Sequence, residues 1–338
     1  MTDDELVWDL ERIGREGWEV YEGTGLDSRA VLARMPKQVK DGFLLDQVPW
    51  ERFLFGHSPH GGLRVRNLLV QACSADRETA GRALGDLTSH LFPDYEVNAS
   101  AALLVPFLLR LGVVPAVPVR VRALGLAAGV ARHGDCGATR DRFLVTVPPG
   151  FYFSCDGYLM TWTIEASRQA ITADTDLLLP LLHDPVAGVR VQAAYTLATA
   201  LDHADRITAA LRARLAVEER PPVRAALVLA CAELAHNHPD PAVAAWLGAL
   251  WRDPHQPADA RVAAALGWLC LTDHPVPDDL QAMVDAFVNA DADKVLDEVP
   301  WFTRFHGLLS TVRQLVHGWP FTYPVPPLPS ARRRHRAS

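Results

Sequence analysis

The residues best suited to bind or transform a ligand gather between positions 133 and 163. This segment combines acidic, aromatic, histidine and cysteine side chains within a short span, and it follows no helical period. Aromatic and acidic side chains on a loop can recognise a partner while the rest of the fold holds them in place. The candidate binding residues are therefore His133, Asp135, Tyr152, Asp156, Tyr158 and Trp162.

A cysteine nucleophile is the reactive alternative for the same segment. Cys136 or Cys155 with His133 supplies the residue types, but catalysis needs an activating base within hydrogen-bond reach of the thiol. The five cysteines of the chain are widely spaced, with no CxxC, and its paired histidines fall in turns that contain proline or glycine. Structural or metal ligands are usually more closely clustered. The sequence thus predicts no catalytic residue, no metal and no cofactor.

The segment interrupts a pattern of helix pairs that is clearest at 178–197. Apolar residues recur there at helical spacing until Asp184 and Pro185, because proline disfavours a helical residue before it. A second helix opens at Arg190, six residues after Asp184, and a narrow apolar stripe of Val189, Ala193, Leu197 and Leu201 runs along it.

This pattern recurs along the chain. Arginines at equivalent helix starts are 34 residues apart from 190 to 224, 37 from 224 to 261 and 38 from 82 to 120. The interval from 120 to 190 is 70 residues, about twice the period, so one unit is replaced or remodelled there. We expect these arginines to form bridges between repeats with nearby aspartates, the alternative being a phosphate-binding row. The residues are Asp76, Arg82, Arg120, Asp184, Arg190, Arg224, Asp253 and Arg261.

The aspartate followed by Val-Arg between two apolar helices resembles the HEAT repeat. Trp50 with Phe55-Gly56, LLVQACSADRETAGRALGDL at 68–87 and AALLVPFLLRLG at 101–112 are similar to PBS-lyase-type HEAT-like repeat proteins, which are common in high-GC bacteria. The resemblance covers about 50–290. It implies an all-α fold, an α-solenoid of HEAT-like helix pairs, and it transfers no catalytic residue.

The repeats define the expected organisation of the chain. Phe143 to Val147 and Phe151 to Cys155 are rich in β-branched and aromatic residues around a Pro-Pro-Gly turn, which predicts a short non-repeat β-hairpin or loop insertion. The expected regions are an N-terminal cap region at 1–45, first HEAT-like repeats at 46–132, the insertion at 133–163, further repeats and a C-terminal cap at 164–318, and a disordered tail rich in proline and arginine at 319–338.

Composition limits the classes of partner. The formal net charge of −7 disfavours nucleic acid, because binding to phosphate normally requires a basic surface. The N-terminus is acidic where a signal peptide would be basic, and no apolar run is long enough to span a bilayer, so we expect a cytoplasmic protein. Lysine occurs only at positions 37, 40 and 294 while arginine, alanine and proline are abundant, which indicates a high-GC bacterial genome. The oligomeric state stays open.

The function that these features favour is a non-catalytic scaffold that mediates protein–protein interaction along a curved surface, with 133–163 contributing specificity. Two alternatives stay open. One is an enzyme on the same scaffold, similar to a bilin lyase or to an alkylpurine DNA glycosylase. The other is a small-molecule binder that uses the 133–163 insertion.

Overall fold

The computed structural model describes residues 28–53, 61–92, 97, 98, 100–132, 139–144 and 160–319. These residues form 17 α-helices and four short 3-10 helices, and no strand occurs among them. The first helices are α2 (Ser28–Arg34), α3 (Lys37–Asp41), η2 (Leu45–Gln47), η3 (Trp50–Arg52), α4 (Gly61–Ala72), α5 (Arg77–Leu91), η5 (Ala101–Leu104), α6 (Val105–Val113) and α7 (Arg120–Val130). The fold of the described chain is therefore all-α.

The later helices continue the pairwise order. They are α8 (Met160–Ala173), α9 (Thr175–Leu178), η6 (Leu179–His183), α10 (Ala187–Leu197), α11 (Ala204–Leu215), α12 (Pro221–Asn237), α13 (Pro241–Arg252), α14 (Ala258–Cys270), α15 (Asp278–Phe287), α16 (Ala290–Val295), α17 (Pro300–Thr303) and α18 (Leu308–Leu315).

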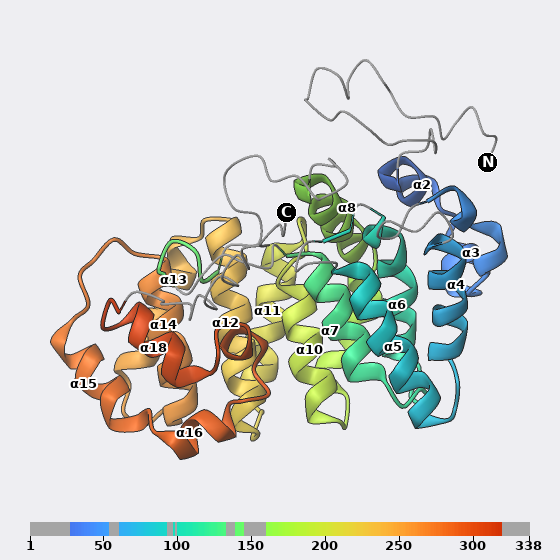
Figure 1. Cartoon of the computed structure of the whole chain (residues 1–338). Helices are drawn as coiled ribbons and strands as arrows, with labels where there is room; N and C mark the ends of the chain where they lie inside the picture. Colours follow the sequence, from blue (N-terminus) through green and yellow to red (C-terminus); the bar gives the residue numbers. More distant parts are fainter. Residues whose placement is uncertain are drawn as a thin grey trace, which may run out of the picture.

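Helix pairs pack side by side in sequence order (Figure 1). The second helices of the pairs, α5, α7, α10, α12 and α14, contact one another in a continuous row, which we call the inner row. The first helices α4, α6, α11 and α13 each pack on their own partner in that row. Each helix thus buries its apolar face against neighbours on two sides, which a single pair could not achieve.

The inner row is dense because small residues face its crossings. A Cβ added at Gly267 of α14 would lie 2.7 Å from the Cβ of Ala232 in α12, so glycine allows these two helices to approach closely. Every residue of α12 from Ala225 to Ala235 is buried. A helix that is apolar on all sides is expected in the centre of a core rather than at a surface.

The last helices fold back across part of this row. Helix α17 contacts α10 and α12, and α18 contacts α14 (Figure 1). Trp301 of α17 is 1% exposed, and its ring meets the ring of Tyr195 edge-on at 4.7 Å. The C-terminal helices therefore cover the inner row at α10, α12 and α14.

The described part of the insertion corrects the β-hairpin prediction. Residues 139–144 form turns, in which the carbonyl of Thr139 accepts hydrogen bonds from the amides of Arg142 and Phe143. Phe143 is fully buried, with its ring 5.7 Å from that of Phe305. Apolar and β-branched composition favours a strand only where a neighbouring strand completes its hydrogen bonds, and no strand occurs among the described residues. The second predicted strand, Phe151 to Cys155, lies outside the described residues.

Among the helices described, none combines the length and the apolar composition needed to cross a bilayer.

Candidate functional site

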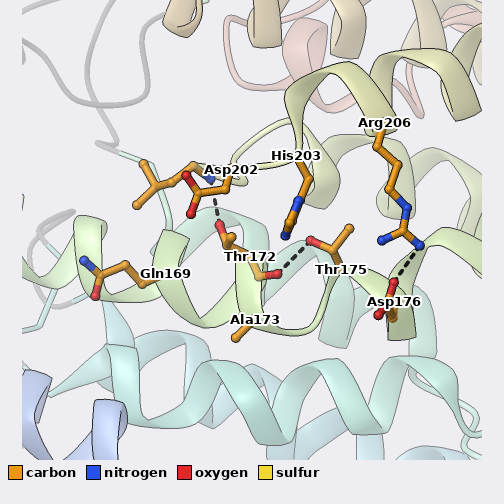
Figure 2. Close-up of a pocket in the computed structure, with 9 residues that line it drawn as sticks. Gln169, Thr172, Ala173, Thr175, Asp176, Asp202, His203 and Arg206 are labelled. Carbon is orange, nitrogen blue, oxygen red and sulfur yellow. Dashed lines mark hydrogen bonds and ion pairs between the residues drawn. The ribbon is translucent and has the colours of Figure 1, made fainter.

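A polar pocket of about 340 Å³ opens between α8, α9 and the start of α11. Figure 2 shows its side chains, which come from α8, from α9, and from the turn and first residues of α11. They are Gln169, Thr172, Ala173, Thr175, Asp176, Leu201, Asp202, His203 and Arg206. Histidine, threonine and aspartate together raise the question of whether a nucleophile and a base meet here.

The two threonine hydroxyls are engaged with the backbone. Thr172 Oγ1 donates to the carbonyl of Arg168 at 2.9 Å and accepts from the amide of Leu201 at 2.7 Å. Thr175 Oγ1 donates to the carbonyl of Thr172 at 2.8 Å, and Thr175 is 2% exposed. Because both hydroxyl protons are already donated to carbonyls, these groups are not arranged as nucleophiles.

The remaining polar groups of the pocket form its rim. His203 precedes α11 with φ of 66°, in the left-handed region that histidine tolerates better than most residues, and its ring points into the pocket (Figure 2). Arg206 pairs with Asp176 at 2.6 Å, and both side chains are largely exposed. This rim can form hydrogen bonds with a polar group of a partner.

Burial disfavours the thiolate form of the thiols within the described part of the chain. It raises the pKa of Cys231 to about 12, and it also raises the pKa values of Cys270 and Cys73, although Cys73 is exposed. A thiol is a nucleophile only as its thiolate, so none of these cysteines is activated at neutral pH. Cys136 and Cys155 lie outside the described residues. Within the described ranges, no three His, Cys, Asp or Glu side chains are placed to hold a metal ion.

Most of the predicted binding residues lie outside the part of the chain that the structure describes. His133, Asp135, Tyr152, Asp156 and Tyr158 belong to ranges that the structure does not describe. Trp162, which the sequence assigned to the insertion, lies in α8 and is 8% exposed. The guanidinium of Arg29 lies 3.8 Å from the centre of its ring, so Trp162 packs between α8 and α2 and does not project from a loop.

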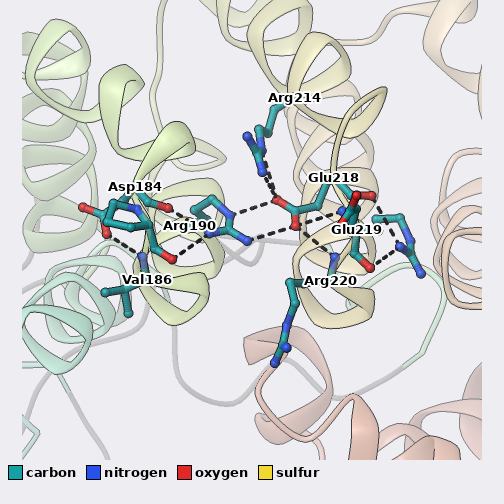
Figure 3. Close-up of polar contacts among 9 residues, drawn as sticks. Asp184, Val186, Arg190, Arg214, Glu218, Glu219 and Arg220 are labelled. Atoms are coloured by element: carbon teal, nitrogen blue, oxygen red, sulfur yellow. Dashed lines mark hydrogen bonds and ion pairs between the residues drawn. The ribbon is translucent and has the colours of Figure 1, made fainter.

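Three ion pairs connect successive members of the inner row, and we call them the arginine ladder. Arg120 Nη2 lies 2.5 Å from Asp184 Oδ2. Arg190 holds Glu218 through two bonds of 2.8 and 2.9 Å, and Arg224 holds Asp259 through two bonds of 2.9 and 2.7 Å. Each arginine lies in the first turns of one inner helix, and its carboxylate partner belongs to the next pair. Figure 3 shows this arrangement for Arg190 and Glu218.

A second contact explains the spacing of the ladder. Arg190 Nη1 donates to the carbonyl of Asp184, six residues earlier, at 2.8 Å, and Arg224 Nη1 donates likewise to the carbonyl of Glu218 at 3.4 Å. The acidic residue at each of these two turns thus joins two arginines of the ladder. Its carboxylate accepts from the arginine of the preceding pair, and its carbonyl accepts from the arginine of its own pair. The carboxylate of Glu218 also accepts from Arg214.

Four residues predicted as bridges have other partners. Asp76 accepts from the amide of Thr79 at 2.8 Å and caps α5, while Arg82 lies exposed, 3.9 Å from Glu78. Asp253 accepts from the amide of His255 at 3.0 Å, and Arg261 Nε donates to the carbonyl of Trp251 at 3.0 Å. Asp76 precedes α5, and the ladder begins only at Arg120 of the following inner helix. The Asp76 carboxylate therefore caps the start of α5 instead of binding an arginine.

The sequence interpretation missed Glu218 and Asp259. A signal for Glu218 was present, because it precedes Arg224 by the same six residues that separate Asp184 from Arg190. Arg110 was also missed. Its guanidinium contacts Asp174, at 2.9 Å from Nη2, and Asp41, at 2.7 Å, and so ties α6 to the start of α9 and to the end of α3.

Glu218 has the most strongly shifted acidity of the ladder. Burial acts to raise the pKa of this carboxyl, but hydrogen bonds from Arg190, from the amide of Arg220 and from Arg214 favour the charged form and lower the pKa to about 2. Figure 3 shows Arg190 and Arg214 converging on the carboxylate. Glu218 is therefore ionised at neutral pH and well into the acid range.

Asp184→Ala is expected to lower the free energy of unfolding by about 3–5 kcal/mol, because it leaves Arg120 buried without a carboxylate. Both side chains of this pair are 9% exposed. Urea denaturation measures the change. Asp253→Ala is the matched control, since Asp253 also accepts from the amide two residues later but bonds the neutral side chain of Gln256 instead of an arginine, and it should cost much less. Equal losses in the two variants would mean that the ladder pair adds nothing beyond a turn cap.

Comparison with known proteins adds no identity to this arrangement: no protein-family model, no curated protein and no solved structure matches the chain.

Proposed function

We propose that the chain is an α-solenoid of HEAT-like helix pairs that acts as a non-catalytic scaffold and binds a protein partner. The observation that carries this proposal is the arginine ladder. Its three buried or half-buried ion pairs each fix one helix pair against the next. A row of pairs held in one geometry presents an extended surface, and it needs no reactive group to do so.

The chemistry of the pocket supports binding over catalysis. The hydroxyls of Thr172 and Thr175 donate to backbone carbonyls, and the described thiols are held protonated by burial. What the pocket offers instead is a set of hydrogen-bonding groups on a rigid rim. Such groups recognise a partner, whereas an acyl or group transfer requires a nucleophile paired with a base.

A partner cannot reach the part of the inner row that the C-terminal helices cover. Helices α17 and α18 lie over α10, α12 and α14, and Phe143 of the insertion packs against Phe305 beside them. A partner of the intact protein would therefore dock on the outer helices, on the edges between pairs, or on the inner row at α5 and α7. The insertion between α7 and α8 would add specificity from residues outside the described ranges.

An affinity pull-down from the host lysate, followed by reconstitution with purified components, tests the proposal. We expect one captured protein to bind the purified chain again in isothermal titration, with saturation and a fixed stoichiometry. The chain with its pocket rim changed by Arg206→Ala serves as a first map of the surface. A co-purifying small molecule that the chain converts, with no protein that rebinds, would contradict the proposal and favour an enzyme.

A further inference from the structure

A groove of about 520 Å³ lies at the edge of the array, between the last turn of α11 and the outer side of α13. Its apolar floor includes Leu215, Trp246 and Leu250, and Pro257 closes one side. Trp246 packs against the core but stays partly exposed. The neighbouring Val217 is 64% exposed. An exposed apolar surface next to polar groups is typical of a docking site.

The charged side chains of this groove are mainly arginines. Arg224 is balanced by Asp259, while the single carboxylate of Glu218 receives both Arg190 and Arg214 (Figure 3). Arg212 is exposed and pairs with no carboxylate among the described residues. The groove therefore carries surplus positive charge on a chain whose formal net charge is −7.

Arg212 is also held in a geometry suited to a carboxylate. Its guanidinium carbon lies 4.7 Å from the centre of the Trp246 ring. Stacking on an aromatic face restricts the side chain while its N–H groups remain free to donate in the plane of the guanidinium. A carboxylate at that position receives two parallel hydrogen bonds, and an apolar neighbour on the same ligand reaches the floor of the groove.

We propose that this groove binds an acidic peptide segment of the partner, in which a glutamate or aspartate sits beside a leucine or an aromatic residue. The carboxylate pairs with Arg212, and the apolar side chain lies on Trp246, Leu215 and Leu250. The inference rests on the proposed scaffold function and specifies which kind of peptide segment the scaffold binds. The positive balance and the apolar floor together favour this occupant over a basic or purely polar segment.

Fluorescence anisotropy with two labelled peptides tests the proposal. The probe alternates glutamate with leucine and phenylalanine, and the control peptide carries lysine in place of glutamate. The full chain should bind the acidic probe and not the basic one, with an affinity that falls as salt is added. Arg212→Glu should weaken binding by about tenfold or more, because it replaces the paired charge with a like charge.

Two further variants keep the result interpretable. Trp246→Ala should weaken binding of the probe by about tenfold through loss of the floor and of the support for Arg212. Arg34→Glu is the matched control, because it makes the same change of charge at an exposed arginine of α2 that lines neither of the two pockets. It should leave the affinity within about twofold. Circular dichroism and the thermal midpoint of each variant establish that it is folded.

Several outcomes would overturn the groove as a peptide site. These are no binding of the acidic probe, equal losses in Arg212→Glu and Arg34→Glu, or tighter binding of a labelled single-stranded RNA that Arg212→Glu abolishes. The last would assign the groove to phosphate. If a purified partner binds the intact chain but Arg212→Glu leaves that affinity unchanged, the scaffold function stands and this inference fails. If the probe binds through Arg212 but no partner exists, the scaffold function fails instead.

Discussion

Replacing Arg132 by alanine is expected to lower the free energy of unfolding by about 3–5 kcal/mol, because it leaves a buried carboxylate without its cation. Arg132 donates to Glu233 Oε1 through two bonds of 3.1 and 2.8 Å and to the carbonyl of Tyr195 at 2.6 Å. Its guanidinium also lies 3.5 Å from the centre of the Tyr195 ring. In the variant, the Glu233 carboxylate would keep the hydrogen bond from Trp301 Nε1, at 2.6 Å, but lose its paired charge.

Urea denaturation compares this variant with Arg122→Ala. Arg122 lies on α7, as one of its exposed residues, and donates to the carbonyl of Gly81 at 2.9 Å. Its loss should cost less than about 1 kcal/mol. Combining Arg132→Met with Glu233→Gln should cost less than the sum of the single changes, because the uncompensated charge is then gone. Similar losses in Arg132→Ala and Arg122→Ala would show that the buried pair does not hold the C-terminal helices on the inner row.

Glu218→Gln should remove a pH-dependent contribution of about 3 kcal/mol, since each tenfold change in proton affinity on folding corresponds to about 1.4 kcal/mol. The folded-state pKa of Glu218 is lowered from 4.5 to about 2. A group with a lowered folded pKa stabilises the fold above its ordinary pKa and loses that effect as the pH falls toward the folded value. The difference in the free energy of unfolding between the native chain and the variant should therefore have its full value at neutral pH and decrease as the pH falls from 4.5 to about 2.

Glu219→Gln provides the control for this titration, because Glu219 is the adjacent, exposed residue. Its variant should follow the native chain at every pH. Unfolding free energies from urea titrations at several pH values measure both differences. A Glu218→Gln difference that stays constant across the acid range would mean that the carboxylate is not held charged by Arg190 and Arg214.

The helix pairs could be predicted from local signals. Asp184 with Pro185 ends one element, and the sequence predicts that the next opens at Arg190, which lies in the first turn of α10, three residues after its start at Ala187. These are local effects of proline geometry and helix ends, so they can be identified without tertiary structure. The first helix of that pair was less predictable. Pro180 divides it into the short α9 and the 3-10 helix η6, because proline lacks the N–H that a continuous helix would need.

Contacts between distant segments could not be predicted in the same way. Glu233 joins Arg132 and Trp301, which are 101 and 68 residues away. Trp162 was assigned to a loop, since nothing in the local sequence indicates that Arg29 lies over its ring. Likewise, no local pattern indicates that α17 and α18 cover the inner row. Side chains that meet only through the stacking of helices leave no periodic signal in the sequence.

The residues that stabilise the fold differ from those proposed to bind a partner. Its carboxylates point to arginines of neighbouring pairs, whereas Arg212 and the rim of the α8–α11 pocket face solvent. Changes in the ladder should therefore lower stability and, through it, the amount of folded scaffold. Changes at Arg212 should alter affinity for a partner and leave the thermal midpoint nearly unchanged.

The measurement that tests the central claim most directly is isothermal titration of the purified partner into the intact chain, followed by intact-mass spectrometry of both proteins and analysis of the mixture for released small molecules. A non-catalytic scaffold predicts saturable binding at a fixed stoichiometry, with both masses unchanged and no product formed. Turnover of a substrate, or a covalent change in the partner that depends on the chain, would contradict that account and establish an enzyme instead.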